Sequence, residues 1–133
     1  MRLTRSSFLA LLLLPGIAAA RHPDCNPEGA QDEMNICAVE ELGAADEELN
    51  KVYRAILARN AGDPLFIEKF KAAQRLWIQL RDAEVEARLP LAEDESGQFK
   101  YGSSFLVEET MALKELTEQR TRYLRAQWLS DQR

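Results

Sequence analysis

The sequence is poor in the residue types on which most enzymes and metal sites depend. Its 133 residues include a single histidine, His22, and two cysteines. It contains none of the H-E-x-x-H, phosphate-loop, G-x-S-x-G or EF-hand patterns. A catalytic serine needs a base to activate it, and a metal site needs several ligands at suitable spacing. The sequence therefore predicts no enzyme activity, no cofactor and no metal site.

The chain also lacks an excess of basic residues and, after residue 20, any long apolar run. With 17 basic and 22 acidic residues, the formal net charge is −5. This balance argues against nucleic-acid binding, because proteins that bind nucleic acid carry basic surfaces. No later stretch provides the roughly 20 apolar residues that a membrane span needs. A lipid anchor is not expected either, since the residues before Cys25 are not the small apolar ones of a lipoprotein cleavage site.

The first 20 residues have the three parts of a secretory signal peptide. Arg2 and Arg5 precede an apolar run from Phe8 to Leu14, and Ala18–Ala20 supply the small residues of a cleavage site. The pattern predicts a signal peptide at 1–20 and a mature domain at 21–133, located in the periplasm or secreted. A buried helix is the alternative interpretation of the apolar run.

Cys25 and Cys37 both lie in the predicted mature domain, with eleven residues between them. That spacing is neither a C-x-x-C redox pair nor half of a zinc site. An exported protein folds in an oxidising compartment, where cysteines form disulfides. The sequence therefore predicts a structural Cys25–Cys37 disulfide.

Apolar residues recur at intervals of three and four in three segments, and no segment alternates as a strand would. The first helix is expected from about Gln31 to Asn60. Asp63 and Pro64 open the second helix, which ends before Pro90, and residues 90–102 are expected to form a long loop. Ser103 or Ser104 can cap the third helix. The predicted fold class is all-α, a small three-helix up-down-up bundle with an N-terminal arm tied by one disulfide. The stripes expected in the core of the second and third helices include Phe66, Phe70, Ala73, Trp77, Leu80, Ala87, Leu106, Leu113, Leu116, Tyr123 and Leu124.

Charges of one sign are grouped along the chain. Residues 24–50 contain nine acidic residues and no basic one, whereas residues 51–75 contain six basic and two acidic residues. In an up-down-up bundle the acidic segments meet at one end. Acids at helix N-termini favour the helix dipole, but the second helix carries its bases early and its acids late, so the dipole does not explain it. The pattern predicts an acidic pole facing a cationic partner, with an ordinary solvated surface as the alternative. The residues of the predicted pole are Asp32, Glu33, Glu40, Glu41, Glu47, Glu48, Glu93, Asp94 and Glu95.

Three blocks of conspicuous residues occur along the chain: D-x-x-L-N at 46–50, Q-x-x-W-x-x-x-R-D at 74–82 and L-T-x-x-R-T at 116–121. Together, and in this order, they resemble the LprI-like N-terminal domain family. The family comprises exported bacterial proteins and is named for a mycobacterial lysozyme inhibitor. Relatives commonly carry a second cysteine pair at the positions that Val85 and Ala112 occupy here. The resemblance implies that these two residues face each other.

The polar residues of the three blocks lie beside the expected apolar stripes, which leaves two interpretations open. Polar groups near a core are costly unless they satisfy one another, so they can form a buried network that fixes helix register. In that case Asp46 or Asp82 accepts from Arg81 or Arg120. Alternatively, the same residues form a partner-binding surface. The residues concerned are Asp46, Asn50, Gln74, Trp77, Arg81, Asp82, Thr117 and Arg120.

The resemblance implies a lysozyme inhibitor whose partner is a protein, and many lysozymes are cationic, which suits the acidic pole. Because the chain has no residues with which to modify an enzyme, inhibition is expected to act by non-covalent occlusion. The alternative is an envelope protein-interaction or accessory module with no lysozyme-inhibiting activity.

Overall fold

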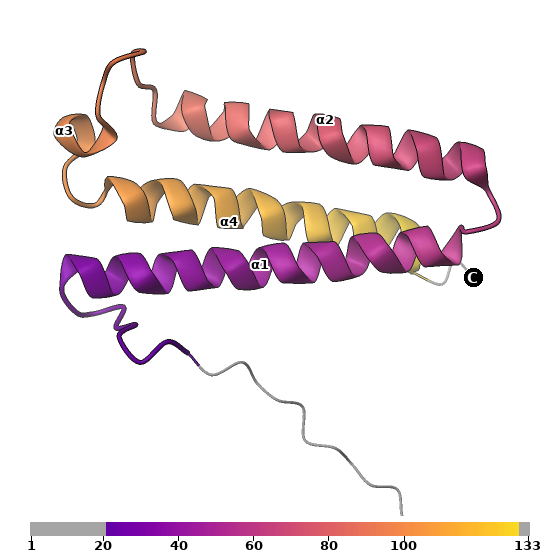
Figure 1. Cartoon of the computed structure of the whole chain (residues 1–133), viewed down its shortest axis with the longest axis horizontal. Coiled ribbons are helices and arrows are strands. Elements are labelled where there is room, and N and C mark those ends of the chain that lie inside the picture. The colour runs from indigo at the N-terminus through magenta and orange to yellow at the C-terminus, as the bar shows by residue number, and fades with distance from the viewer. Residues whose placement is uncertain (1–20, 131–133) are drawn as a thin grey trace, which may run out of the picture.

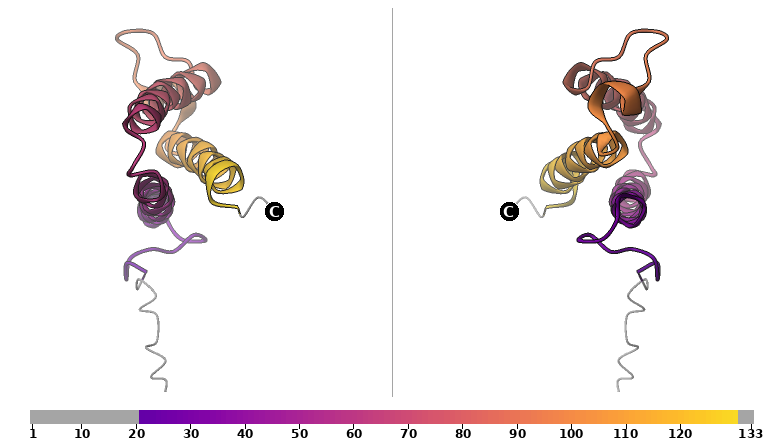
Figure 2. Two further views of the ribbon diagram at one scale, coloured as in Figure 1. Left: turned by 90° about the vertical axis from the view of Figure 1, so that its right-hand side faces the viewer. Right: turned by 90° about the vertical axis from the view of Figure 1, so that its left-hand side faces the viewer.

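The computed structural model describes residues 21–130, which fold into three long helices. These are α1 (Gln31–Arg59), α2 (Pro64–Arg88) and α4 (Phe105–Leu124). They run up, down and up (Figure 1), and the end-on views place them at the corners of a triangle (Figure 2). The predicted all-α class and three-helix order are confirmed. The predicted signal peptide lies outside the described residues.

The ends of α1 and α2 follow from local hydrogen bonding. At the start of α1 the Glu33 carboxylate accepts from the Ala30 N–H at 2.8 Å, and at the start of α2 the Asp63 carboxylate accepts from the Phe66 N–H at 2.9 Å. Both bonds satisfy backbone donors that a helix start leaves free. Ser104 stands at the N-cap of α4, as expected, but its side chain does not cap the backbone. Its hydroxyl instead donates to Glu108 Oε1 at 2.7 Å.

The core lies mainly between the first and the last long helix. α1 and α4 pack closely along their length, whereas α2 approaches α4 less extensively and its backbone barely reaches α1. The central cluster consists of Leu49, Val52, Ile56, Phe70 and Leu124. Burial of apolar area of this kind is the main stabilising term in a small domain.

An aromatic cluster closes one end of the bundle and joins α2 to the other elements. The ring of Phe70 stacks on Tyr53 of α1, with 5.3 Å between centroids. Trp128, in the π-helical turn η1 (Arg125–Leu129) that continues α4, meets Phe66 edge-on at 5.1 Å. Aromatic pairs in these geometries add to the stability given by area burial alone. Trp128 was not among the residues predicted to lie in the core.

The predicted core stripe of α2 is partly wrong. Phe70 is buried and Phe66 and Trp77 are half-buried, but Ala73, Leu80 and Ala87 are exposed. Gln74, Arg81 and Val85 occupy the other positions of α2 that face the bundle. On α4, Tyr123 is also exposed rather than buried. The reason is geometric: α2 is apolar on two adjacent faces, and the bundle covers only one of them.

Residues 90–102 are not simply a long loop, because they include a short helix, α3 (Gly97–Tyr101). The Pro90 carbonyl accepts from both Lys100 Nζ and the Tyr101 hydroxyl, each at 2.9 Å. Gly97 packs so closely on the Phe105 ring that a Cβ would lie 2.2 Å from the nearest ring atom. Gly102, with φ of 84°, adopts the left-handed conformation that glycine tolerates. The segment is therefore folded back on itself and docked on α4.

The predicted disulfide is confirmed. Cys25 and Cys37 are bonded, with 4.7 Å between their Cα atoms, and tie the arm at 21–30 to the second turn of α1. The His22 N–H adds a hydrogen bond to Glu40 Oε1 at 2.6 Å. Val85 is buried and Ala112 half-buried; their mutual facing stays a prediction. Among the helices of residues 21–130, none is long and apolar enough to cross a membrane.

Candidate functional site

Most of the residues singled out from the three sequence blocks gather around the side chain of Arg81, in the middle of the bundle. Its guanidinium donates to Asp82 Oδ1 at 2.9 Å and to Thr117 Oγ1 at 3.3 Å. It also lies 3.6 Å from Asp46 Oδ1. The Arg81 side chain is only 17% exposed, whereas both carboxylates are about half exposed. One arginine of α2 therefore contacts α1 and α4 at the same time.

Trp77 lies beside two cations. The guanidinium carbons of Arg81 and Arg120 are 5.4 Å and 5.5 Å from the centroid of its ring, within the range of cation–π attraction. Arg120 Nε donates to Gln74 Oε1 at 3.1 Å. Desolvation lowers the pKa of Arg120, since burial penalises the charged form. Gln74, Trp77, Arg81 and Arg120 thus form the middle part of the α2–α4 contact.

We refer to Asp46, Gln74, Trp77, Arg81, Asp82, Thr117 and Arg120 as the signature network. It contains seven of the eight residues singled out from the sequence. The eighth, Asn50, is exposed and lies along a shallow surface hollow with Glu47 and Arg54. Within residues 21–130, no buried side-chain nitrogen or oxygen lacks a hydrogen-bond partner. The contacts favour the interpretation that the network fixes helix register, and its use as a partner surface stays a prediction.

The acidic residues of α1 are spread over about 24 Å of helix, at 1.5 Å per residue, rather than gathered at one end. Glu41 accepts from Lys114 Nζ at 2.7 Å, and this hydrogen bond raises the pKa of Lys114. Glu48 pairs with Arg125. Both carboxylates are thus paired with basic side chains, Lys114 of α4 and Arg125 of η1. Glu33 and Glu40 bind backbone N–H groups, while Asp32 and Glu47 are exposed.

The acids of residues 93–95 stand at the far end of the molecule from the aromatic cluster. Glu93 and Asp94 are exposed and form no ion pair within residues 21–130. Glu95 accepts from Lys100 Nζ at 2.9 Å and from the Ala92 N–H at 3.1 Å, and these bonds lower its pKa. Glu95 is therefore part of the fold of this segment, whereas its two neighbours are free to meet a partner.

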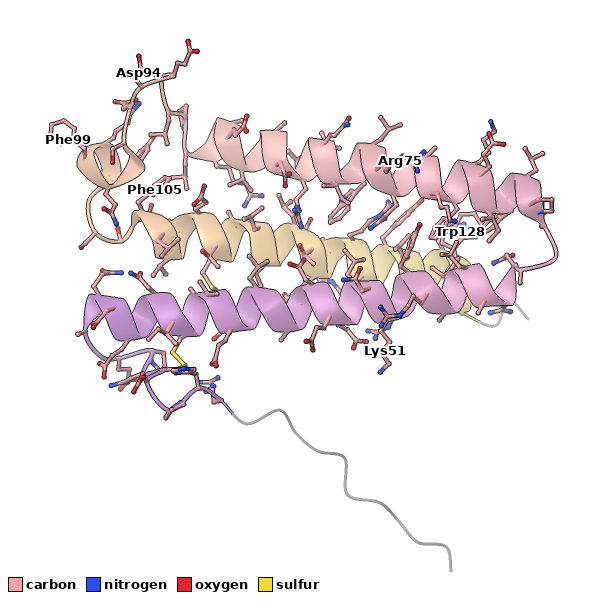
Figure 3. The ribbon with its side chains drawn as sticks, in the orientation of Figure 1. Lys51, Arg75, Asp94, Phe99, Phe105 and Trp128 are labelled. Atoms are coloured by element: carbon pink, nitrogen blue, oxygen red, sulfur yellow. A yellow bond between two sulfur atoms is a disulfide. The ribbon has the colours of Figure 1, made fainter. Side chains whose placement is uncertain are left out.

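Phe99 is the residue of this segment that sequence analysis missed. Its side chain is 90% exposed, the highest value among the large apolar residues of the described chain. Figure 3 shows Phe99 and Asp94 extending away from the helices at this end. Phe99 shares a surface hollow with residues 92–96. An aromatic residue in a polar segment between two glycines was the available signal. We call Glu93, Asp94 and Phe99 the loop tip.

In residues 21–130, no three histidine, cysteine, aspartate or glutamate side chains are grouped so as to hold a metal ion. What the loop tip offers is an apolar ring and two negative charges, which suits the binding of a protein surface.

The family model described as lysozyme inhibitor LprI matches residues 24–124. An uncharacterized protein of Rhizobium meliloti (strain 1021) is 37% identical over 91 residues. That alignment covers 60% of this chain and 66% of the relative, just under two thirds of its length. No solved structure matches the chain significantly.

Proposed function

Because the chain belongs to the lysozyme inhibitor LprI family, we propose that it binds a lysozyme and inhibits it by non-covalent occlusion. The family match over residues 24–124 is the observation that carries this proposal. The signal-peptide pattern of residues 1–20 supports a periplasmic or secreted location, where a lysozyme would be met.

We propose the loop tip as the surface that enters the enzyme. Exposed apolar rings rimmed by polar groups are typical of binding sites, and buried aromatic anchors supply much of the affinity of many interfaces. Phe99 projects from the end of a narrow bundle (Figure 3), so it can reach into a concave surface that the helices themselves could not enter.

The tethers of the segment support this role for the tip. Pro90 receives two hydrogen bonds from the end of α3, and Gly97 is packed against Phe105. A segment that is already ordered loses less conformational entropy on binding than a free loop does. The carboxylates of Glu93 and Asp94 add attraction for a cationic enzyme. Such charges mainly raise the association rate, and they are screened over about 8 Å at physiological salt.

The test is lysis of a peptidoglycan suspension by a cationic lysozyme, with and without the chain purified from the periplasm of an expression host, over a salt series. Phe99→Ala should weaken inhibition by about thirtyfold, the equivalent of the roughly 2 kcal/mol typical of an anchor residue. Glu93→Lys with Asp94→Lys should slow association, and the defect should shrink as salt rises. Glu95 is left unchanged because it holds the fold of the segment.

Two matched variants serve as controls. Val39→Ala removes another exposed apolar side chain, and Glu68→Lys reverses an exposed acid near the opposite end of the bundle. Neither should alter inhibition. If excess wild-type chain leaves lysis unchanged at low salt for several lysozyme classes, the inhibitor proposal fails and the accessory-module alternative replaces it. If the chain inhibits but the loop-tip variants act as wild type, the function holds and the binding surface lies elsewhere.

A further inference from the structure

α2 carries a second apolar face that the bundle leaves uncovered. Leu65, Leu76 and Leu80 are 62%, 65% and 56% exposed. Several alanines of α2 lie on the same face as these leucines, at spacings of three, four and seven residues. At 100° per residue, these leucines and alanines all fall within an arc of about 100° around the helix axis. We call this face the outer stripe; its members are Leu65, Ala72, Ala73, Leu76, Leu80, Ala83 and Ala87.

The outer stripe is distinct from the face of α2 that packs in the bundle. The packed face contains Phe66, Phe70, Trp77 and Val85, which follow a register shifted around the helix. In Figure 1, α2 forms one edge of the molecule along its whole length. A monomeric protein rarely exposes a continuous apolar strip of this kind, and such strips commonly mark interaction surfaces.

The two halves of α2 differ in net charge. Residues 64–76 carry Lys69, Lys71 and Arg75 against Glu68, a net charge of +2, whereas residues 77–88 carry Asp82, Glu84 and Glu86 against Arg81 and Arg88, a net charge of −1. This order opposes the helix dipole, which favours acids at the start and bases at the end. Contacts inside the molecule do not explain it. Arg81, Asp82 and Arg88 form ion pairs inside the molecule. Of Lys69, Lys71, Arg75, Glu84 and Glu86, only Lys69 forms an ion pair among the described residues, at 2.8 Å from its sequence neighbour Glu68.

We propose that two copies of this chain pair through the outer stripes of their α2 helices, in antiparallel orientation about a two-fold axis. A two-fold axis presents the same patch twice, so the patch must complement itself. The antiparallel orientation sets the basic half of each α2 beside the acidic half of its partner, whereas a parallel one would set like charges together. The leucines and alanines fill the seam, as in an antiparallel coiled coil with flanking ion pairs.

Lys69 lies within the outer stripe and fits the same arrangement. Its aliphatic stem can cover apolar surface while its ammonium reaches the partner's acidic half. At 25 residues, α2 is about 37 Å long at 1.5 Å per residue, which is long enough for both charged halves to engage. The loop tips would lie at opposite ends of the dimer and stay free. The inference therefore does not depend on the proposed function.

The experiment is sedimentation analysis of the periplasm-purified chain from low micromolar to high micromolar concentration. Wild type should be a dimer over the upper part of this range. Leu76→Glu with Leu80→Glu should abolish the dimer, and circular dichroism should show retained helix because both residues are exposed in the monomer. Val39→Glu, at a comparably exposed site on α1, should leave the dimer intact. A wild-type chain that is monomeric throughout, or a dimer insensitive to the stripe substitutions, overturns the proposal.

Charge exchange tests the orientation with no change to the leucines and alanines of the seam. One variant carries Lys69→Glu and Arg75→Glu, the other Glu84→Lys and Glu86→Lys. Both halves of α2 then have a net negative charge in the first variant and a net positive charge in the second. Each variant should be a monomer, but an equimolar mixture should form a heterodimer because a net acidic α2 then faces a net basic one. A chain with all four substitutions should dimerise alone. Failure of both the mixture and the fourfold variant to dimerise overturns the antiparallel arrangement.

Discussion

Removing the Arg81 side chain should separate the two interpretations of the signature network. Arg81→Ala deletes a hydrogen bond to Thr117, contacts with two half-exposed carboxylates, and one cation–π contact with Trp77. A net hydrogen bond stabilises by about 1 kcal/mol, an exposed ion pair by about 0.5 kcal/mol, and a partly exposed cation–π contact by about 1 kcal/mol. We therefore expect the free energy of unfolding to fall by about 2–3 kcal/mol.

The assay is urea unfolding of the periplasm-purified chain, followed by circular dichroism. For a domain of this size the expected loss corresponds to roughly 10 °C in Tm. Arg75→Ala is the matched control, because Arg75 is an exposed arginine of the same helix (Figure 3) and should change stability by less than about 0.5 kcal/mol. Asp46→Ala should cost less than Arg81→Ala, since its carboxylate supplies only one of the four contacts.

The outcome that would refute the reasoning is an Arg81→Ala chain as stable as Arg75→Ala. The network would then not hold α2 in place, and the partner-surface interpretation would become the better account of these residues. A double-mutant cycle between Arg81 and Asp46 should give a coupling of about 0.5 kcal/mol, as expected for a half-exposed ion pair at 3.6 Å.

The remaining predictions concern the arm, one ion pair, the tethered segment and the N-terminus. Replacing both Cys25 and Cys37 by alanine should lower the free energy of unfolding by about 2–3 kcal/mol, because the disulfide closes a loop with a sequence separation of 12. Urea unfolding measures this loss, and adding a reductant to the variant should have no further effect. Glu41 raises the pKa of Lys114 above its ordinary value of 10.5, so the pair stabilises the fold fully at neutral pH and progressively less as pH rises through the raised pKa. Lys114→Met should therefore reduce the fall in the free energy of unfolding measured between about pH 9 and pH 12. Gly97→Ala should displace α3 from Phe105 and speed proteolysis within residues 90–102, whereas Gly62→Ala, where nothing lies within 4 Å of an added Cβ, should not. Mass spectrometry of the exported chain should find Arg21 as the first residue; a mature N-terminus far from it contradicts the signal-peptide prediction.

The bounds of the first two helices could be predicted because local chemistry decides them, and the disulfide could be predicted because the expected mature domain holds two cysteines. Asp63 and Pro64 mark a helix start by hydrogen bonding and fixed φ, and the helix they open ends before Pro90 as expected. Most of the signature network comes together for a similar reason: the spacing of Gln74, Trp77 and Arg81 puts them on one side of α2, and Asp82 joins as the sequence neighbour of Arg81. Asn50 does not join them because it lies further round α1.

What could not be predicted depends on how helices pack. A sequence shows that α2 is apolar on a wide arc, but it does not show which part of the arc a neighbour covers, so Ala73 and Leu80 were assigned to the core in error. α3 was missed because a helix of five residues, with a glycine at its start and another directly after it, is too short to show helical periodicity. Its stability comes from Pro90 and Phe105, which contact it only in the folded chain.

The close packing of α1 against α4 has a consequence for the folding of the chain. The best-packed helices are the first and the last, and pairs such as Glu41 with Lys114 and Glu48 with Arg125 are 73 and 77 residues apart in sequence. Contacts between distant residues require a large loss of chain entropy before they form, so proteins rich in them fold slowly. This domain should therefore fold more slowly than a helical bundle of equal length whose successive helices pack together. A ribosome-bound or partly translocated chain that ends before Phe105 has no α4 on which α1 can pack, so the core can form only after nearly the whole sequence has emerged.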